Sequence, residues 1–233
     1  FILTDAQASF PFDIEKNRTK TDSVAIDNKK YPRYINEFWT SKQRQASSLH
    51  ELAYRACFKP QLPRFFINLL TSEGDIVYDP FGGRGTTALE AGLLGRNIIS
   101  NDISPLSKIL CQPRFFIPDE GQVEKRLSKI KISKRAKAEI DLSMFFHPQT
   151  EEELISLKHY LETKNEDYID KWIRMVATNR LTGHSVGYFS VYTLPPNQAV
   201  SPESQIKINK KRNQKPEYRN INQIILKKTQ NLI

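Results

Sequence analysis

The sequence that decides the fold runs from residue 75 to residue 104 and reads DIVYDPFGGRGTTALEAGLLGRNIISNDIS. Residues 76–78 are a short β-branched and aromatic run, which is typical of a buried parallel strand. A glycine-rich turn interrupts that run, and residues 86–94 are then rich in Ala, Leu and Glu, which predicts a helix that ends at Gly95. Residues 98–99 begin a second strand. The stretch therefore predicts half of a nucleotide-binding βαβ unit in an α/β fold.

The turn between the first strand and the helix leaves room for a ligand. Residues 83–88 fit the pattern G-x-G-x-x-A, in which bare backbone lets a ligand approach a helix N-terminus. Asp102 follows about 20 residues later, where a carboxylate usually holds ribose hydroxyls. Asp79 would repel a dinucleotide pyrophosphate, which disfavours NAD. Its charge would suit S-adenosylmethionine (SAM), which carries an ammonium and a sulfonium but no phosphate. The alternative is a tight structural turn in which Asp79 is only a capping residue.

Three segments resemble a known family. Residues 79–87 (DPFGGRGTT) and 95–105 (GRNIISNDISP) resemble motif I and the next acidic strand end of the DNA methyltransferases that modify the exocyclic amines of adenine (N6) or cytosine (N4). Residues 58–67 (FKPQLPRFFI) are similar to motif X of that family. The resemblance implies a Rossmann-like, SAM-dependent methyltransferase sheet, double-stranded DNA with a flipped base as substrate, and a role in restriction-modification. RNA guanine methyltransferases have similar turns and are an alternative.

The resemblance also implies roles in cofactor binding. Asp79 would face the methionine ammonium, Asp102 would accept hydrogen bonds from the ribose hydroxyls, and Ile103 would pack on adenine. The glycines would allow close backbone approach, the two threonines would cap the helix and bind the carboxylate, and motif X would flank the methionine end. The predicted cofactor-binding residues are Lys59, Pro60, Asp79, Pro80, Phe81, Gly82, Gly83, Gly85, Thr86, Thr87, Asp102 and Ile103.

The family's catalytic motif, in which Asp, Asn or Ser precedes Pro-Pro and an aromatic residue, is not recognisable in the chain. The Pro-Pro pair at residues 195–196 lies between Leu194 and Asn197. Leu194 cannot accept a hydrogen bond from a target amine and Asn197 is not aromatic, so we interpret this tetrapeptide as a turn. The catalytic residues are therefore unassigned.

The predicted sheet is incomplete as well. Strands are predicted near residues 75–79, 97–101 and 187–192, whereas the family's core, by resemblance, needs about seven. We therefore expect the chain to be the cofactor-binding portion of an enzyme, completed by a downstream segment or a second chain that carries the catalytic motif. A non-catalytic nucleic-acid-binding subunit with a vestigial turn is a further alternative.

The order of the motifs predicts four parts. Residues 1–46 are an N-terminal arm, irregular apart from one short strand, and residues 47–118 are the SAM-binding part. Residues 119–182 are a helical insertion suited to target recognition, and residues 183–233 return to the α/β core and end in helices. Helices are predicted at residues 47–58, 150–161, 168–181, 203–211 and 220–233. Basic runs at residues 125–137 and 207–215 are either solvated faces or phosphate contacts.

Composition favours an acidic polymer as partner. The 233 residues carry a formal net charge of +9, which suits nucleic acid. Cys57 and Cys111 have no metal-ligand spacing and predict no disulfide scaffold, so we expect a reducing, cytoplasmic location without a metal site. No signal peptide and no apolar run of membrane-spanning length is recognisable. Because the chain begins with Phe1 rather than Met, we expect a fragment or a processed product.

Overall fold

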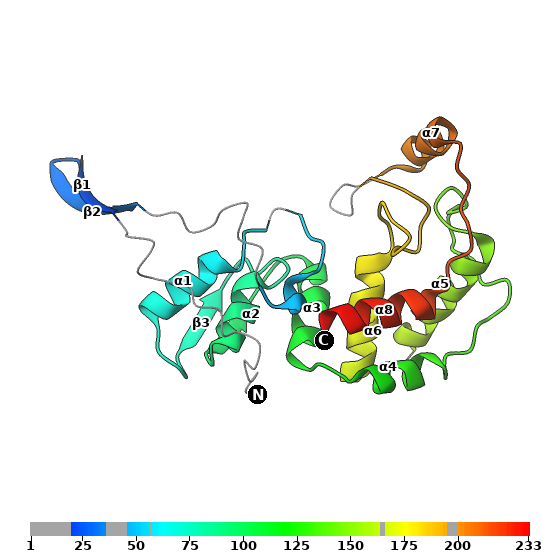
Figure 1. Cartoon of the computed structure of the whole chain (residues 1–233), viewed down its shortest axis with the longest axis horizontal. Coiled ribbons are helices and arrows are strands. Elements are labelled where there is room, and N and C mark those ends of the chain that lie inside the picture. The colour runs from blue at the N-terminus through cyan, green and yellow to red at the C-terminus, as the bar shows by residue number, and fades with distance from the viewer. Residues whose placement is uncertain (1–19, 36–45, 56, 164–165, 195–199) are drawn as a thin grey trace.

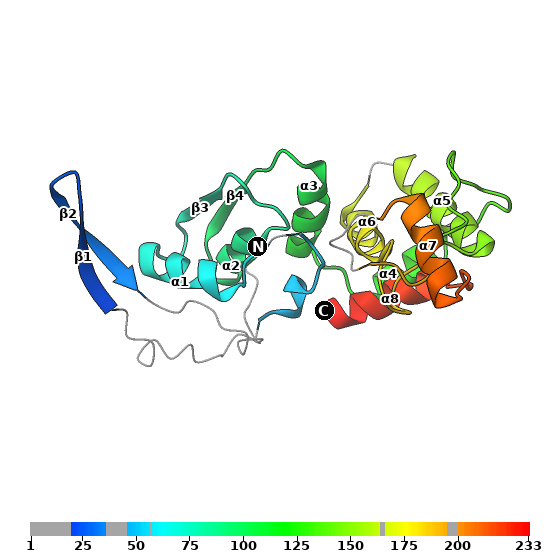
Figure 2. The ribbon, with the colours of Figure 1, turned by 90° about the horizontal axis from the view of Figure 1, so that it is seen from above.

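The computed structural model describes residues 20–35, 46–55, 57–163, 166–194 and 200–233. A strand hairpin lies at one end of an elongated molecule, an α/β unit follows, and a group of helices lies at the other end (Figure 1 and Figure 2). The α/β unit contains α1 (Gln61–Leu70), β3 (Ile76–Asp79), α2 (Thr86–Leu93), β4 (Asn97–Ser100), α3 (Pro105–Cys111) and the 3-10 helix η2 (Gln112–Phe115). The helical part contains α4 (Glu120–Leu127), α5 (Pro148–Glu162), α6 (Tyr168–Arg180), α7 (Pro202–Arg212) and α8 (Ile221–Leu232).

The strand, turn, helix and strand predicted for residues 75–104 are present. β3 and β4 pair in parallel, with Ile76 opposite Asn97 and Asp79 opposite Ser100. The connecting helix α2 buries Ala88 and Leu89 against the core and covers one face of the strand pair. The mixed α/β class is thus confirmed.

The other face of the strand pair is apolar and open. Ile76, Tyr78 and Ile99 share this face, because side chains alternate along a strand and Tyr78 pairs with Ile99. Their exposed fractions are 64%, 59% and 53%. Parallel sheets normally have both faces covered, so β3 and β4 alone leave an uncovered surface, which we name the open sheet face.

The helical part is built around Trp172 of α6. Its indole Nε1 donates to Thr229 Oγ1 of α8 at 3.1 Å, and both residues are fully buried. The same core cluster continues through Val123 to Leu110 and Leu89 of the α/β unit. The predicted boundary between residues 118 and 119 therefore crosses one continuous core.

The N-terminal arm differs from the prediction of one short strand. Residues 20–35 form an antiparallel hairpin of β1 (Lys20–Ile26) and β2 (Lys29–Ile35). Asp27 and Asn28 form its two-residue turn with φ of 48° and 62°, values that a tight hairpin requires and that Asp and Asn tolerate. Residues 1–19 and 36–45 of the predicted arm lie outside the described residues.

The helix predicted at residues 47–58 is wrong. Apart from the 3-10 helix η1 (Ser48–His50), the described part of this segment is irregular. Side chains that are distant in sequence donate hydrogen bonds to its carbonyl groups. Arg84 donates to the carbonyls of His50 and Leu52 at 3.0 and 2.8 Å. Asn179 likewise donates to the carbonyl of Ala53 at 3.0 Å. These tertiary hydrogen bonds replace the ladder of a helix.

The strand predicted at residues 187–192 is also wrong. Only an isolated bridge between Gly183 and Tyr192 occurs there, so no strand of this segment joins β3 and β4. Arg219 explains the difference: its Nη1 atom contacts the carbonyls of Ser185, Tyr188 and Ser190, the first two at 3.0 and 2.8 Å. The segment curls around this guanidinium instead of extending.

The four remaining predicted helices are confirmed, with their ends shifted by at most two residues, as α5, α6, α7 and α8. The tetrapeptide of Leu194 to Asn197 lies mostly outside the described residues, which end at Leu194 and resume at residue 200. None of the helices in the described ranges combines the length and apolarity that crossing a membrane requires.

Candidate functional site

The loop between β3 and α2 lies against α3. Gly85 precedes the first turn of α2 with φ of 82°, a left-handed conformation that favours glycine. A Cβ atom at this position would lie 2.3 Å from Cys111 Sγ and 2.9 Å from its Cβ. Gly83 is also left-handed, with φ of 53°, but a Cβ there would meet only the ring of Tyr54, at 3.4 Å. The loop therefore needs glycine at residue 85 for space as well as for conformation.

Asp102 ties this loop to the end of β4. Its Oδ2 accepts a hydrogen bond from the amide of Gly83 at 2.7 Å, and its Oδ1 accepts from the amide of Ser104 at 2.9 Å. These backbone amides, from Ser104 and then Gly83, hold the pKa of Asp102 below its usual value. Because each carboxylate oxygen has a second lone pair and the side chain is half-buried, Asp102 keeps acceptor capacity toward solvent.

Asp79 and two exposed apolar side chains complete the rim of the loop. Asp79 Oδ1 accepts from the amide of Phe81 at 3.0 Å, while its Oδ2 has no partner among the described residues. Phe81 and Ile103 are 87% and 101% exposed. Two negative strand ends and two bare apolar side chains thus surround one glycine loop, an arrangement suited to a ligand with a cationic group and an apolar ring.

The capping role predicted for the two threonines is wrong. Gly85 is the N-cap of α2 and forms no side-chain cap, whereas Thr86 is the first helical residue. Thr86 is buried, and its Oγ1 accepts from Arg84 Nε at 3.2 Å. Thr87 is half-buried. The first amides of α2 have no side-chain cap, and such amides attract a ligand carboxylate.

The motif X segment lies beside the motif I unit. Pro60 is buried at the start of α1 and Lys59 is exposed next to it. Phe58, α1, β3 and Thr87 line one apolar groove of about 460 Å³. Phe58 and α1 therefore lie beside α2, the helix that follows the glycine loop.

Two arginines that the sequence did not single out shape the site. Arg84 in the loop donates to the carbonyls before motif X, as described above. Arg114 is fully buried and donates to the carbonyls of Leu110 at 2.9 Å, Leu49 at 3.0 Å and Arg84. This burial lowers the pKa of Arg114 to about 10. In the sequence, the feature that could have indicated Arg114 is its position before the apolar residues Phe115 and Phe116. A charged side chain buried among apolar residues needs hydrogen-bond partners.

A family model described as DNA methylase matches residues 2–108. Over these residues the chain is similar to the DNA methylase family. The matched residues include every one of the predicted cofactor-binding residues, together with α1, β3, α2 and β4.

Parts of the chain are also similar to three methyltransferases. A type II methyltransferase, M.BsoBI of Geobacillus stearothermophilus, is 31% identical over 160 residues, which are 61% of this chain and 31% of that protein. M.PvuII of Proteus hauseri, also a type II methyltransferase, is 45% identical over 78 residues, 34% of this chain and 23% of that protein. A tRNA (guanine(10)-N2)-dimethyltransferase of Methanocaldococcus jannaschii is 42% identical over 62 residues, 26% of this chain and 18% of that protein.

The chain spans less than a third of the length of each of these relatives. No solved structure matches it significantly.

Proposed function

We propose that the chain is the SAM-binding portion of a DNA methyltransferase that acts on the exocyclic amine of adenine or cytosine. The observation that carries this proposal is the glycine loop between two carboxylates, Asp79 and Asp102, with Phe81 and Ile103 exposed beside it. Phosphate would be repelled there, whereas a sulfonium and an ammonium would be attracted. The family match of residues 2–108 supports the same ligand.

Each residue of the loop would contact a different part of SAM. The free Oδ2 of Asp79 would accept from the methionine ammonium, Asp102 would accept from the ribose hydroxyls, and Ile103 would cover the adenine ring. The glycines would let the backbone approach, the first amides of α2 would bind the carboxylate, and the remaining predicted residues would shape the methionine end. Bound SAM would supply an electrophilic methyl group for transfer.

The open sheet face supports the view that the chain is completed by further polypeptide. In this proposal β3 and β4 are two strands of a larger, doubly wound Rossmann-like sheet. The additional strands would bury Ile76, Tyr78 and Ile99, which would otherwise leave apolar surface and strand edges exposed. That further segment or chain would also bring the catalytic motif and help to hold the flipped base of double-stranded DNA. The four parts expected from the sequence, with residues 119–182 in target recognition, belong to the same proposal.

Isothermal titration with SAM tests the proposal, with NAD as the comparison ligand and Asp79→Asn as the matched variant. The proposal predicts binding of SAM, no binding of NAD, and weaker SAM binding by Asp79→Asn because the ammonium loses its counter-charge. Absence of SAM binding, or equal affinity for NAD, would contradict the proposal. Binding of nucleic acid without SAM would favour a non-catalytic subunit.

A second candidate is an RNA methyltransferase on the same cofactor site. The similarity of 62 residues to a tRNA dimethyltransferase favours it. Methyl transfer from labelled SAM to duplex DNA and to RNA, with the completing segment supplied, separates the two candidates, since each predicts label on only one polymer.

A further inference from the structure

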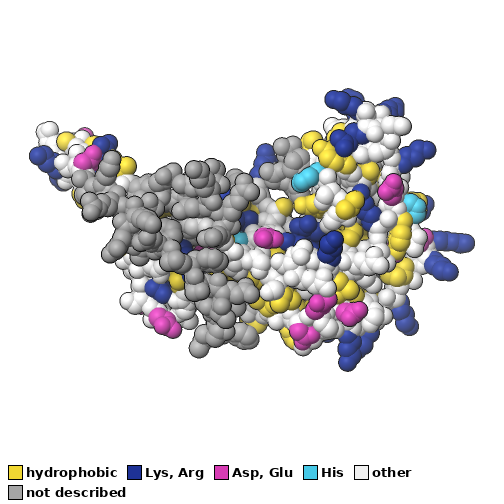
Figure 3. Space-filling view, viewed as in Figure 1, with side chains coloured by type: hydrophobic (Ala, Val, Ile, Leu, Met, Phe, Trp, Pro, Cys, Tyr) yellow, Lys and Arg dark blue, Asp and Glu magenta, His cyan; other side chains and the backbone are white. Residues whose placement is uncertain are grey.

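The basic residues at 207–215 differ from the run at 125–137 in their contacts with acidic side chains. α7 projects from the helical part (Figure 1), and Lys and Arg side chains gather where it lies, at the upper right of the space-filling view (Figure 3). Residues 202–215 contain five basic residues and one acid, Glu203. Only Gln205 of α7 is buried.

One face of α7 anchors the helix. The buried Gln205 Nε2 donates to the carbonyl of Tyr192 at 3.0 Å, and Asn209 Nδ2 donates to the carbonyl of Met144 at 2.8 Å. The guanidinium of Arg212 lies over the ring of Tyr192, 3.7 Å from its centroid. Since a helix has 3.6 residues per turn, Gln205, Asn209 and Arg212 lie within one narrow stripe.

The opposite face of α7 carries the lysines. Lys207, Lys210 and Lys211 are exposed and lie on the side away from Gln205, with Lys215 just beyond the helix. Within the described residues, none of these four lysines forms an ion pair. Like charges three and four residues apart destabilise a helix, so this arrangement opposes stability of α7 unless an anion neutralises it.

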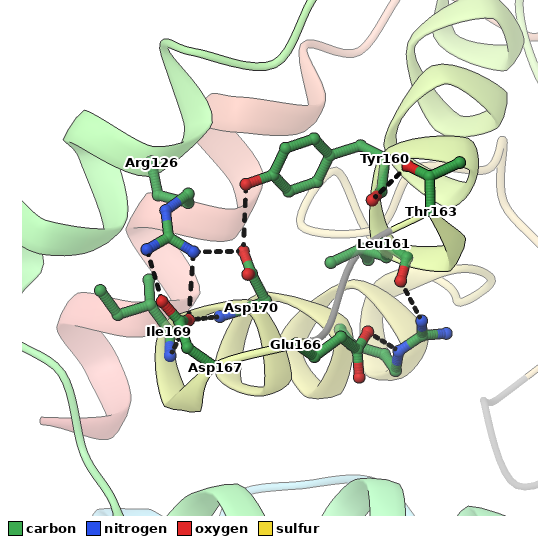
Figure 4. A network of polar contacts seen from close by, with 9 residues as sticks. Arg126, Tyr160, Leu161, Thr163, Glu166, Asp167, Ile169 and Asp170 are labelled. Atoms are coloured by element: carbon green, nitrogen blue, oxygen red, sulfur yellow. Dashed lines mark hydrogen bonds and ion pairs between the residues drawn. The ribbon is translucent and has the colours of Figure 1, made fainter.

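Acidic side chains contact the run at 125–137 at two places, the side chain of Arg126 and the backbone near its end. Arg126 forms ion pairs with Asp167 at 2.7 Å and Asp170 at 2.6 Å, and Tyr160 also contacts Asp170 (Figure 4). Glu152 and Glu151 accept from the amides of Arg135 and Ala138 at 2.8 and 3.0 Å. Carboxylates from other segments therefore lie against part of this run, and they weaken its attraction for phosphate.

We infer that the lysine face of α7 binds the phosphate backbone of duplex DNA and positions it on the helical part. This inference rests on the proposed function and adds the surface that holds the substrate. Three lysines on one helix, which the amides of Gln205 and Asn209 anchor on the opposite face, contact a regular array of phosphates at small conformational cost. Such contacts position the duplex and do not read its sequence.

The test compares two variants of the full chain with the same change of charge. One carries Lys207→Gln, Lys210→Gln, Lys211→Gln and Lys215→Gln, and the matched control carries Lys129→Gln, Lys131→Gln, Lys134→Gln and Lys137→Gln. All eight lysines are exposed, and glutamine preserves helix propensity. Fluorescence anisotropy measures binding of a labelled DNA duplex over a range of salt concentrations, circular dichroism checks folding, and calorimetry measures SAM binding.

The α7 variant should lose roughly tenfold or more in duplex affinity at about 0.1 M salt, and the slope of log K against log salt should become shallower by about 2–4. The control should lose less than about threefold. SAM binding should stay unchanged in both variants.

Equal losses in the two variants, an unaffected α7 variant, no duplex binding by the wild type, or tighter binding of an RNA hairpin that depends on the same lysines would each overturn the inference. Wild-type chain that binds DNA through α7 but does not bind SAM would refute the proposed function and leave the inference standing.

Discussion

Gly85 is constrained by its conformation and by its neighbour at the same time. Its left-handed φ of 82° excludes most side chains, and Cys111 occupies the space that a Cβ atom would need. Gly74 has a similar φ of 86° but nothing within 4 Å of a Cβ. A comparison of Gly85 with Gly74 therefore separates the effect of the left-handed φ from that of crowding, because of these two only Gly85 is crowded.

Gly85→Ala should lower the free energy of unfolding by about 2–4 kcal/mol, the sum of left-handed strain and overpacking against Cys111. Gly74→Ala should lower it by only about 1 kcal/mol, from the strain alone. Urea unfolding followed by circular dichroism measures both values. Equal effects at the two positions would show that α3 does not crowd the loop.

Asp102 is the residue whose substitution tests the ribose contact. Asp102→Asn should weaken SAM binding roughly ten- to hundredfold, because a charged acceptor is lost both to the ribose and to the loop amide of Gly83. Asp75→Asn is the matched control, since Asp75 caps the amide of Ser72 at 2.8 Å outside the loop. Calorimetric titration with SAM gives both affinities. An equal affinity of Asp102→Asn and wild type would remove Asp102 from the site.

At the scale of elements, residues 75–104 were predictable and the segments around 47–58 and 187–192 were not. The former unit is decided locally, by hydrophobic runs, glycines and a helix-forming stretch. The latter two are decided by Arg84 and Arg219, which lie far away in sequence. These arginines donate hydrogen bonds to backbone carbonyls that would otherwise accept the hydrogen bonds of a helix or a sheet. Single-sequence periodicity contains no information about such partners.

The ion pairs of Arg126 join α4 to the start of α6. The Arg126 guanidinium lowers the pKa of Asp167 to about 2. Since this folded-state pKa lies below the ordinary value of 3.8, the pair stabilises the fold above about pH 4, and that contribution is lost as pH falls toward 2. The Asp167 side chain is 45% exposed, so solvent screening limits the contribution to about 1 kcal/mol or less.

Asp167→Asn should therefore lower stability at pH 7 and have progressively less effect as pH falls from 4 to 2. Glu162→Gln is the control, since the exposed pair of Glu162 with Lys158 at 3.8 Å should contribute little at any pH. Urea unfolding at several pH values measures the difference. A pH-independent effect of Asp167→Asn would contradict the role of the ion pair.

At the scale of the whole molecule, the open sheet face is the feature that the sequence indicated but could not locate. Too few predicted strands implied an incomplete sheet, and the structure shows which side chains remain uncovered. Among the predicted site residues, those of the loop and the end of β4 could be recognised because they follow one motif. Arg114 could not, because its role depends on the carbonyls of Leu49 and Arg84, which only the fold brings together.

The open sheet face should promote self-association when the chain is isolated. Ile76→Thr with Ile99→Thr should shift association to higher protein concentration, because less apolar area remains exposed. Val186→Thr with Ile206→Thr is the control, since these residues are exposed singly outside the sheet. Sedimentation velocity measures the monomer fraction. An equal shift in the two variants would show that the sheet face is not the contact surface.

A crystal structure of the chain grown with SAM shows whether the glycine loop holds the cofactor. We expect adenine beside Ile103, the ribose hydroxyls on Asp102, and the methionine ammonium at Asp79, with the backbone of Gly83 to Gly85 against the ligand. An empty glycine loop at saturating SAM, or a ligand bound elsewhere, would contradict this expectation.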